Sequence, residues 1–233
     1  LHVVWHGGSE YSTQICYSKY NGVSWSEPFN LTAEVEPSIG GLDPSIAIDG
    51  SDNIHVFWWG TCADSPGNYL VRYCKYNGVS WSAPMNITTD STKNQRYPCM
   101  AVDSSDNLHL IWYGTHAGST TFAQIRYSKS TNGGDSWSAP INLTTQSTRH
   151  QERPSIAIDG SDNIQVVWRG SIDGTANFQI RYTKYNGVSW SSVINLTDSP
   201  YGQYEPSIAV DSSDNLHVVW HGGSEYSTQI CYS

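Results

Sequence analysis

Two recurring positions of this 233-residue chain carry charged and aromatic residues whose types could bind a ligand. The first position follows a tryptophan that recurs along the chain, and its occupant changes each time: His6, Trp59, Tyr113 and Arg169. The second precedes a recurring proline, and this position and the one before it also vary: Leu42-Asp43, Arg96-Tyr97, Glu152-Arg153 and Tyr204-Glu205. Aromatic rings can stack on sugar rings, and cationic groups can bind carboxylates or hydroxyl groups.

These positions recur because the chain is built of repeats. Equivalent points lie 53, 54, 56 and 52 residues apart, at Leu1, Ile54, Leu108, Ile164 and Leu216. The segment LHVVWHGGSEYSTQICYS at the start returns unchanged at residues 216–233. Such a period is typical of repeat architectures, in which each unit buries its apolar faces against its neighbours. The chain starts inside a repeat, with Leu rather than Met, so we expect it to be a piece of something longer.

Each repeat predicts four short strands. From Pro44, the alternating PSIAID is followed by the turn DGSDN and by IHVFWW, which is rich in β-branched and aromatic residues. A variable stretch leads to YLVRYCKY, an Asn-Gly turn and SAPMNIT. Four strands in about 50 residues, without helical periodicity, predict one propeller blade per repeat, with strands A to D running outward from the axis. A solenoid of stacked β-coils is the alternative, although its turns are usually shorter.

We therefore expect a single all-β domain, a β-propeller of five blades with incomplete terminal blades. The predicted units are residues 1–43 as a partial blade, 44–97, 98–153 and 154–205 as full blades, and 206–233 as a second partial blade. The alternative is a four-bladed ring with a redundant terminal segment, in which residues 206–233 pair with the D strand near residues 24–32. The duplicated terminal segments could also exchange between chains and produce self-association.

The turn between the last two strands carries a resemblance to a known family. In the third repeat this turn reads Ser130-Thr131-Asn132-Gly133-Gly134-Asp135-Ser136-Trp137, and the other repeats have the shorter Tyr-Asn-Gly-Val-Ser-Trp. The longer turn resembles the Asp-box, or BNR repeat, of sialidase-type propellers (Ser-x-Asp-x-Gly-x-Thr-Trp), with Asn132 replacing the aspartate and Ser136 the threonine. The resemblance covers the whole chain and implies a β-propeller. In that family the box is a folding element on the face away from the active site, so it implies little about activity.

Loop variation indicates which face of the propeller is functional. The A–B and C–D turns scarcely change between repeats, whereas the B–C and D–A loops differ everywhere. Positions that stay equal within one chain are those that the blade needs for folding. We therefore expect the ligand site on the B–C/D–A face, where both variable positions lie, and we expect the constant tryptophan to belong to the core.

The predicted function is a non-enzymatic, lectin-like surface that binds a glycan or glycoconjugate at sub-sites repeated around this face. Trp59 and Tyr113 would stack on sugar faces, while Arg153, Arg169 and His6 hold hydroxyl groups. The resemblance implies an alternative, a sialidase-like glycoside hydrolase with three arginines, a tyrosine activated by a glutamate, and an acidic aspartate. The face offers residues of these types at Arg96, Arg149, Arg153, Arg169, Tyr97, Tyr204, Glu152 and Glu205, but the Arg-Ile-Pro motif of sialidases is absent from the sequence. A structural or adhesive surface repeat is the third alternative.

Two further recurring motifs favour a structural interpretation. The N-glycosylation sequon Asn-x-Thr recurs at equivalent strand ends, beginning at Asn30, Asn86, Asn142 and Asn195. Its identical placement favours a role in closing the strand. The Asp-x-Ser-Asp-Asn turns offer oxygen ligands of the kind that Ca²⁺ prefers, but they lack the usual ligand spacing and the distal glutamate, which favours a hairpin turn. We expect no metal and no cofactor.

Composition excludes several classes of partner. A net charge of −9 argues against nucleic acid, because binding phosphates requires clustered Lys and Arg. No apolar run approaches the ~20 residues needed to span a bilayer, so we expect no membrane insertion. The five cysteines show neither metal-ligand nor disulfide spacing. Low charge, abundant Trp and Tyr, and similarity to secreted BNR proteins predict an extracellular or cell-surface protein, although unpaired cysteines favour the opposite.

Overall fold

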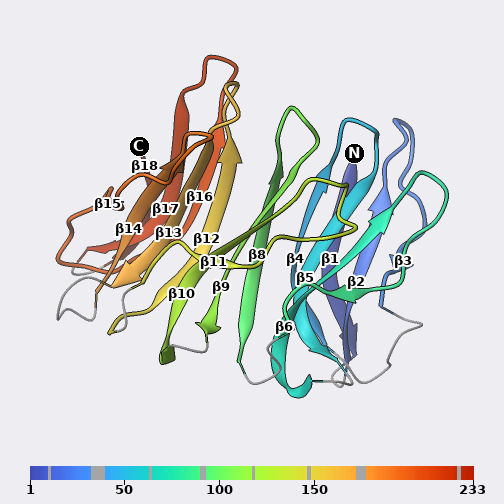
Figure 1. The fold of residues 1–233 in the computed structure, drawn as a ribbon, viewed down its shortest axis with the longest axis horizontal. Helices are drawn as coiled ribbons and strands as arrows, with labels where there is room; N and C mark the ends of the chain where they lie inside the picture. The colour runs from blue at the N-terminus through green and yellow to red at the C-terminus, as the bar shows by residue number, and fades with distance from the viewer. Residues whose placement is uncertain are drawn as a thin grey trace.

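The structure is a computed structural model that describes residues 1–9, 12–32, 40–62, 65–89, 93–116, 119–145, 148–171, 177–224 and 227–233. These residues form strands, turns and loops without a helix, and the strands group into five antiparallel sheets in the order of the sequence (Figure 1). In this described part of the chain there is accordingly no helix long and apolar enough to cross a membrane.

The three central sheets have four strands each, and the two terminal sheets have three. The first sheet contains β1 (His2–Ser9), β2 (Ser12–Lys19) and β3 (Phe29–Asn30). The second contains β4 (Gly41–Ile48), β5 (Ile54–Cys62), β6 (Ser65–Tyr76) and β7 (Met85–Asn86). The third contains β8 (Gln95–Val102), β9 (Leu108–His116), β10 (Ser119–Ser130) and β11 (Ile141–Asn142). The fourth contains β12 (Gln151–Ile158), β13 (Ile164–Ser171), β14 (Phe178–Tyr185) and β15 (Ile194–Asn195), and the fifth contains β16 (Gln203–Val210), β17 (Leu216–Ser224) and β18 (Ser227–Tyr232).

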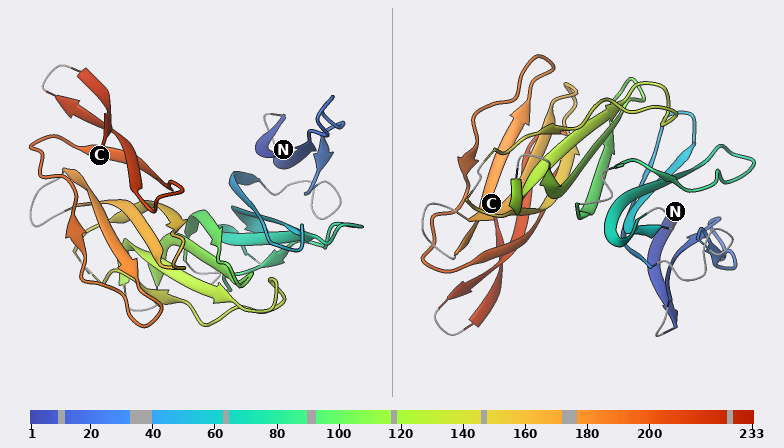
Figure 2. Two further views of the ribbon diagram at one scale, coloured as in Figure 1. Left: turned by 90° about the horizontal axis from the view of Figure 1, so that it is seen from above. Right: turned by 60° about the horizontal axis from the view of Figure 1, so that its bottom comes forward.

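This arrangement confirms the predicted β-propeller of four-stranded blades with incomplete terminal ones. The A strands β4, β8, β12 and β16 lie beside one another, so strand A is innermost as expected. Figure 2 shows the sheets as an arc, with the two termini at its opposite ends. The four-bladed alternative is not adopted, because β18 pairs with β17 and β3 pairs with β2.

The duplicated terminal segments form hairpins of the same register. Trp5 lies opposite Cys16 in the first sheet, and Trp220 lies opposite Cys231 in the fifth. Exchange of these hairpins between copies stays a prediction. The predicted unit boundaries also stay predictions, and each falls inside an inner strand.

Tryptophans of the B strands form the core between the sheets, as their recurrence predicts. Trp112 and Trp168 are fully buried. The indole N–H of Trp112 donates to Gln95 Oε1, and that of Trp168 donates to Gln151 Oε1, both over 2.7 Å. These hydrogen bonds satisfy the only polar group of each indole, which makes complete burial favourable.

The C–D turns join neighbouring sheets through a second set of tryptophans. Trp81 packs edge-on against Tyr17 of the preceding sheet, with ring centroids 5.0 Å apart, and Trp190 packs in the same way against Tyr127 at 5.3 Å. In the longer turn of the third sheet, Trp137 lies against Phe57 and Tyr73. Edge-to-face aromatic pairs add to the stabilisation from buried area. The turn that resembles the Asp-box is therefore a packing element between sheets.

The two other recurring motifs also stabilise the blades. Asp49 Oδ1 accepts hydrogen bonds from the backbone N–H groups of Ser51 and Asn53, so this carboxylate closes the A–B turn. In the sequon Asn142-Leu143-Thr144, the hydroxyl of Thr144 accepts the backbone N–H of Ile125 over 3.0 Å and is buried. The same threonine contact recurs at Ile15, Val71 and Ile180. Both motifs thus have the structural role that their placement predicts.

Candidate ligand-binding site

Each inner strand contains a bulge beside its proline, and the residue before the proline has a left-handed backbone. Asp43, Tyr97, Arg153 and Glu205 have φ angles of 45°, 54°, 53° and 50°. The pairing register with the neighbouring strand shifts at the same place in all four strands. This conformation costs a residue with a Cβ about 1–3 kcal/mol. A bulge changes the direction in which a side chain points. The same bulge therefore orients four chemically different side chains in the same way in four blades.

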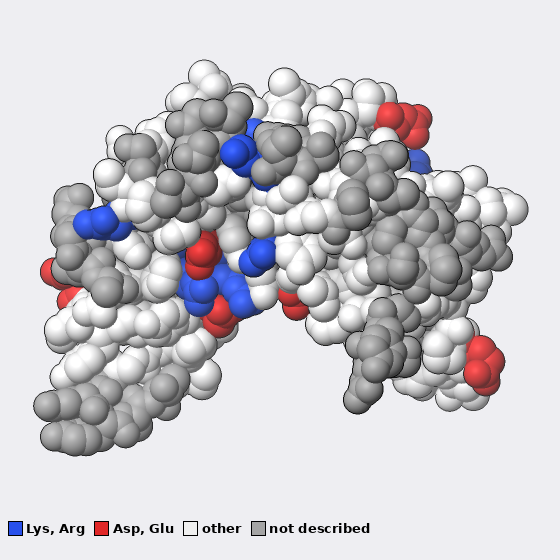
Figure 3. Space-filling model, turned by 90° about the horizontal axis from the view of Figure 1, so that it is seen from below, with Lys and Arg blue, Asp and Glu red and all other residues white. Residues whose placement is uncertain are grey.

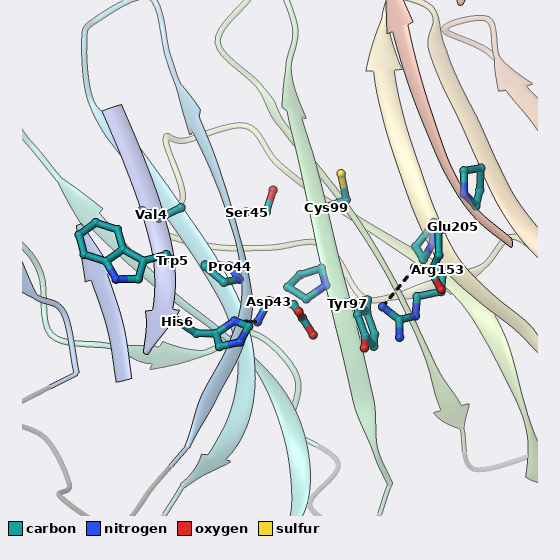
Figure 4. A pocket seen from close by; sticks show the side chains of 13 residues that line it. Val4, Trp5, His6, Asp43, Pro44, Ser45, Tyr97, Cys99, Arg153 and Glu205 are labelled. Carbon is teal, nitrogen blue, oxygen red and sulfur yellow. Dashed lines mark hydrogen bonds and ion pairs between the residues drawn. The ribbon is translucent and has the colours of Figure 1, made fainter. Parts of the chain in front are cut away.

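These four residues line a single cavity of about 560 Å³ on the concave side of the arc. Figure 4 shows them on separate strands around a common space, with His6 of β1 at one side and Glu205 at the other. Figure 3 shows basic and acidic groups gathered in the hollow of this face. The volume lies in the ~300–1,000 Å³ range of small-molecule sites. The structure therefore replaces the expected ring of sub-sites with one composite cavity, because the curvature of the arc brings equivalent residues together.

Tyr97 lies at the centre of the contacts in this cavity. The guanidinium carbon of Arg153 is 3.5 Å from the centroid of its ring, and the ring of Tyr113 stacks on it at 5.4 Å with an interplanar angle of 12°. Burial raises the pKa of Tyr97; the charge of Arg153 opposes this rise, and the charge and hydrogen bond of Asp43 add to it. The phenol is therefore protonated at neutral pH, and it can donate as well as accept a hydrogen bond.

Asp43, on β4 of the second sheet, connects this sheet to His6 of the first. Its Oδ2 accepts the indole N–H of Trp59 over 2.9 Å, and its backbone N–H donates to His6 Nδ1 over 3.2 Å. Trp59 is only 7% exposed, and Tyr113 only 8%. The sugar-stacking surface that we expected on these two rings is therefore covered. Instead, the ring of Tyr113 stacks on Tyr97, and the indole of Trp59 donates a hydrogen bond to Asp43.

Arg169 contacts two carboxylates and two aromatic rings, and its Nε is buried without a hydrogen-bond partner among the described residues. Its Nη2 lies 2.8 Å from Glu152 Oε2, and its Nη1 lies 3.0 Å from Glu205 Oε1. The rings of Phe178 and Tyr204 lie over its guanidinium carbon at 4.8 and 5.5 Å. Glu205 also pairs with Arg153, Oε2 to Nη1, over 3.3 Å. Arg169 is thus a bridge between the fourth and fifth sheets.

The structure brings four of the predicted site residues to the cavity wall and places the others around it. The wall includes His6, Tyr97, Arg153 and Glu205, whereas Trp59, Tyr113, Arg96, Arg169 and Tyr204 are outside the set that lines it. Arg96 lies between the rings of Trp59 and Tyr69, 5.4 and 4.7 Å from their centroids, and Tyr204 stacks on His221.

Sequence reasoning missed the wall residues that follow each proline. Ser45 and Cys99 occupy this position and line the cavity. The signal was present, because each recurring proline is followed by a small serine or cysteine. Burial raises the pKa of the Cys99 thiol, and all five cysteines are free. Among the described residues, no group of three or more His, Cys, Asp or Glu is placed to hold a metal ion.

The repeats and the propeller fold agree with a match to a known family. Residues 43–197 match the model of the BNR repeat-containing family, and this segment covers more than half of the chain. The chain therefore belongs to the BNR repeat-containing family, as the turn of the third repeat suggested.

One sequence relative and two solved structures of similar fold are longer than this chain. It is similar to a sialidase of Bacteroides fragilis, with 32% identity over 136 residues, which are 53% of this chain and 25% of the sialidase. Its fold is similar to that of an ulvan lyase, with a TM-score of 0.65 and 15% identity over 99% of this chain and 65% of the lyase. It is also similar to an endo-arabinase of Bacteroides thetaiotaomicron, with a TM-score of 0.63 and 12% identity over 100% of this chain and 88% of the arabinase. The chain thus spans a quarter of the sialidase and about two thirds of the lyase.

Proposed function

We propose that this chain is a non-enzymatic, lectin-like module that binds carbohydrate in the cavity of its concave face, and that it acts outside the cell or at the cell surface. The observation that carries the proposal is the set of four bulged residues before prolines. Their backbone is the same in four blades, although it is strained, and their side chains are all different. Strain of this kind persists where the surrounding structure imposes it, commonly at ligand sites.

The chemistry of the cavity suits a sugar. Carboxylate, guanidinium, imidazole and phenol groups of Asp43, Arg153, His6 and Tyr97 surround one space and offer directional hydrogen bonds to hydroxyl groups. The pyrrolidine rings of the prolines contribute apolar surface beside them. A sugar ring presents both hydroxyl groups and C–H faces, so this mixture of polar and apolar surface supports a carbohydrate over a purely apolar ligand.

The names of the related proteins support the same ligand class. They are a sialidase, a lyase of the polysaccharide ulvan and an endo-arabinase, and each name refers to a carbohydrate. The proteins that this chain resembles are thus named for different carbohydrates. A glycan is therefore our proposed ligand, and its identity depends on the side chains at the four bulges.

A sialidase-like hydrolase is the second candidate, because Tyr97, Asp43 and Arg153 share the cavity. The raised pKa of Tyr97 disfavours this reaction, since a nucleophilic tyrosine must lose its proton. Turnover of a fluorogenic sialoside that disappears in Arg153→Ala would establish hydrolysis in place of simple binding.

A glycan array tests the binding proposal directly. We expect the chain to bind a defined subset of glycans, and we expect Tyr97→Ala to abolish this binding while the circular dichroism spectrum is unchanged. Tyr20→Ala is the matched control, because Tyr20 lies in the C–D turn, where its hydroxyl contacts Gly22 O, and should leave binding intact. An array without binding, or equal loss in both variants, would contradict the proposal.

A further inference from the structure

We infer that the cavity takes a neutral glycan and discriminates against glycans that carry carboxylate groups, an inference that rests on the proposed carbohydrate-binding function. The relevant feature is the state of the arginines. A site built for an acidic sugar needs guanidinium edges that are free to form paired hydrogen bonds with the incoming carboxylate. In this protein the edges of Arg153 and Arg169 are partly paired with carboxylates of the chain itself, and the Nε atom of each is buried.

Arg169 offers no accessible pair of N–H groups to a ligand, because both terminal nitrogens are paired and its Nε, which has no hydrogen-bond partner among the described residues, is buried. Glu152 and Glu205 lie at its two terminal nitrogens, 2.8 and 3.0 Å away, and Phe178 and Tyr204 lie against its faces. Its side chain is only 18% exposed. An acidic sugar could reach this guanidinium only by displacing a glutamate that is already in place, so Arg169 contributes little to anion binding.

Arg153 lines the cavity and is paired at one terminal nitrogen, while its Nε is buried without a hydrogen-bond partner among the described residues. Its Nη1 pairs with Glu205 Oε2 over 3.3 Å, and the face of its guanidinium covers the ring of Tyr97 at 3.5 Å. The Glu205 side chain is the more exposed partner, at 40% against 30% for Arg153. A ligand that enters the cavity therefore meets the carboxylate at least as readily as the guanidinium.

The overall charge of the cavity points in the same direction. Its wall contains two carboxylates, Asp43 and Glu205, and one guanidinium, that of Arg153. Arg96 is not part of this wall, because its guanidinium lies between two aromatic rings. The chain as a whole carries a charge of −9. Like charges brought together cost binding free energy, and the field of the whole protein also repels anions.

A neutral sugar uses these groups better. Sugar hydroxyls can donate to the carboxylates of Glu205 and Asp43, and hydrogen bonds from O–H to a charged oxygen are among the stronger ones. The phenol of Tyr97 and the imidazole of His6 complete the set of donors and acceptors at the wall. No ion pair of the protein has to break for such contacts to form.

The test compares pairs of oligosaccharides that differ only in charge. Oligogalacturonates and their carboxyl-reduced forms provide such pairs, because the two members have the same length and linkages. Affinities are measured by calorimetry or on an array that contains both members of each pair. We expect the neutral member of any pair that binds to bind at least about tenfold more tightly, equivalent to about 1.4 kcal/mol. The preference should shrink in 1 M salt, where the Debye length is about 3 Å.

Glu205→Gln provides the decisive variant. It removes the exposed negative charge and weakens the pairing of Glu205 with both Arg153 and Arg169. The ratio of the affinity for the neutral glycan to that for the acidic glycan should therefore fall by about fivefold. Glu27→Gln is the matched control, because Glu27 is an exposed carboxylate in the C–D turn of the first sheet. This control should leave the ratio unchanged.

The outcomes separate this inference from the proposed function. Wild-type protein that binds acidic members as well as or better than neutral ones overturns the inference and leaves carbohydrate binding intact, even if Glu205→Gln does not fold. Protein that binds neither member of any glycan pair overturns the proposed function, and the inference with it.

Discussion

Gln165 occupies in the fourth sheet the position that His55 occupies in the second, and the two side chains make equivalent contacts. Gln165 Nε2 donates to Asp159 Oδ2 over 2.8 Å, and His55 Nε2 lies 3.1 Å from Asp49 Oδ2. On the other side, Gln165 Oε1 accepts the hydroxyl of Tyr182, as His55 Nδ1 meets the hydroxyl of Tyr73 over 2.7 Å. An amide carries no charge, so this position requires only a neutral donor and acceptor. The histidine is a structural element here.

Acidification should therefore destabilise the fold in two stages. Burial lowers the pKa of His55 and of His109 in the folded protein. Between about pH 6.5 and these lower pKa values the unfolded chain therefore binds more protons than the folded protein, and the free energy of unfolding falls as the pH falls. Burial alone would raise the pKa of Asp103, but hydrogen bonds from His109 and Asn107 lower it to about 2. The carboxylate contribution is thus present above about pH 4 and is lost as pH falls toward 2. Thermal unfolding from pH 8 to 3 measures both stages.

The double variant His55→Gln and His109→Gln separates the two stages, because the fourth sheet already tolerates glutamine. We expect its melting temperature at pH 8 to stay close to that of the wild type, and the decline that begins below about pH 6.5 to flatten. The decline below pH 4 should persist. His6→Gln is the control, because this exposed residue should not alter either stage. A double variant in which the first stage of the decline is unchanged would show that other groups cause it.

The tryptophans of the C–D turns should differ strongly in their contribution to stability. Trp137→Ala removes a ring that packs against Phe57 and Tyr73 of the preceding sheet, and should cost about 2–4 kcal/mol in the free energy of unfolding. Trp25→Ala is the matched variant at the equivalent position, where the ring is 50% exposed, and should cost less than about 1 kcal/mol. Urea unfolding monitored by circular dichroism gives both values. Equal losses in the two variants would mean that the contacts of Trp137 with Phe57 and Tyr73 do not add to the stability of the fold.

The sequence predicted the fold more completely than the site, for physical reasons. The period and the turn residues determine the blade, because each strand buries its apolar side chains against the next repeat. The burial of Trp59 could not be predicted, because its cover comes from Tyr69 and Tyr97, whose placement depends on how the sheets meet. The left-handed backbone at Asp43 was also unforeseeable, since a residue before proline favours an extended conformation. Both features lie where blades converge on the axis.

The hydroxyl of Thr144 should contribute measurably to the fold, which tests the structural role of the sequons. Thr144→Val keeps the shape of the side chain but leaves the buried N–H of Ile125 without its acceptor, at a cost of about 1–3 kcal/mol. Thr144→Ser keeps the hydroxyl and should lose much less. Urea unfolding of the two variants decides the matter. Equal stability of the valine and serine variants would leave the recurrence of this threonine without a structural cause.

The strain at the four bulges can be measured at Glu205, whose side chain is exposed and whose φ is 50°. Glu205→Ala and Glu205→Gly both remove the carboxylate and its pairs with Arg153 and Arg169. At an ordinary position alanine is the more stable of the two by up to about 1 kcal/mol, because glycine loses more backbone entropy on folding. Here the order should reverse, since only the alanine retains the steric cost of the left-handed backbone, and we expect the glycine variant to be more stable by about 1 kcal/mol.

Ser213 supplies the control pair Ser213→Ala and Ser213→Gly, because it is an exposed residue in the following A–B turn and is not among the positive-φ residues. This pair should keep the ordinary order of stability. An alanine variant at residue 205 that is as stable as the glycine variant would mean that the bulge relaxes without its carboxylate, and that the ion pairs of Glu205 hold the backbone in its strained form.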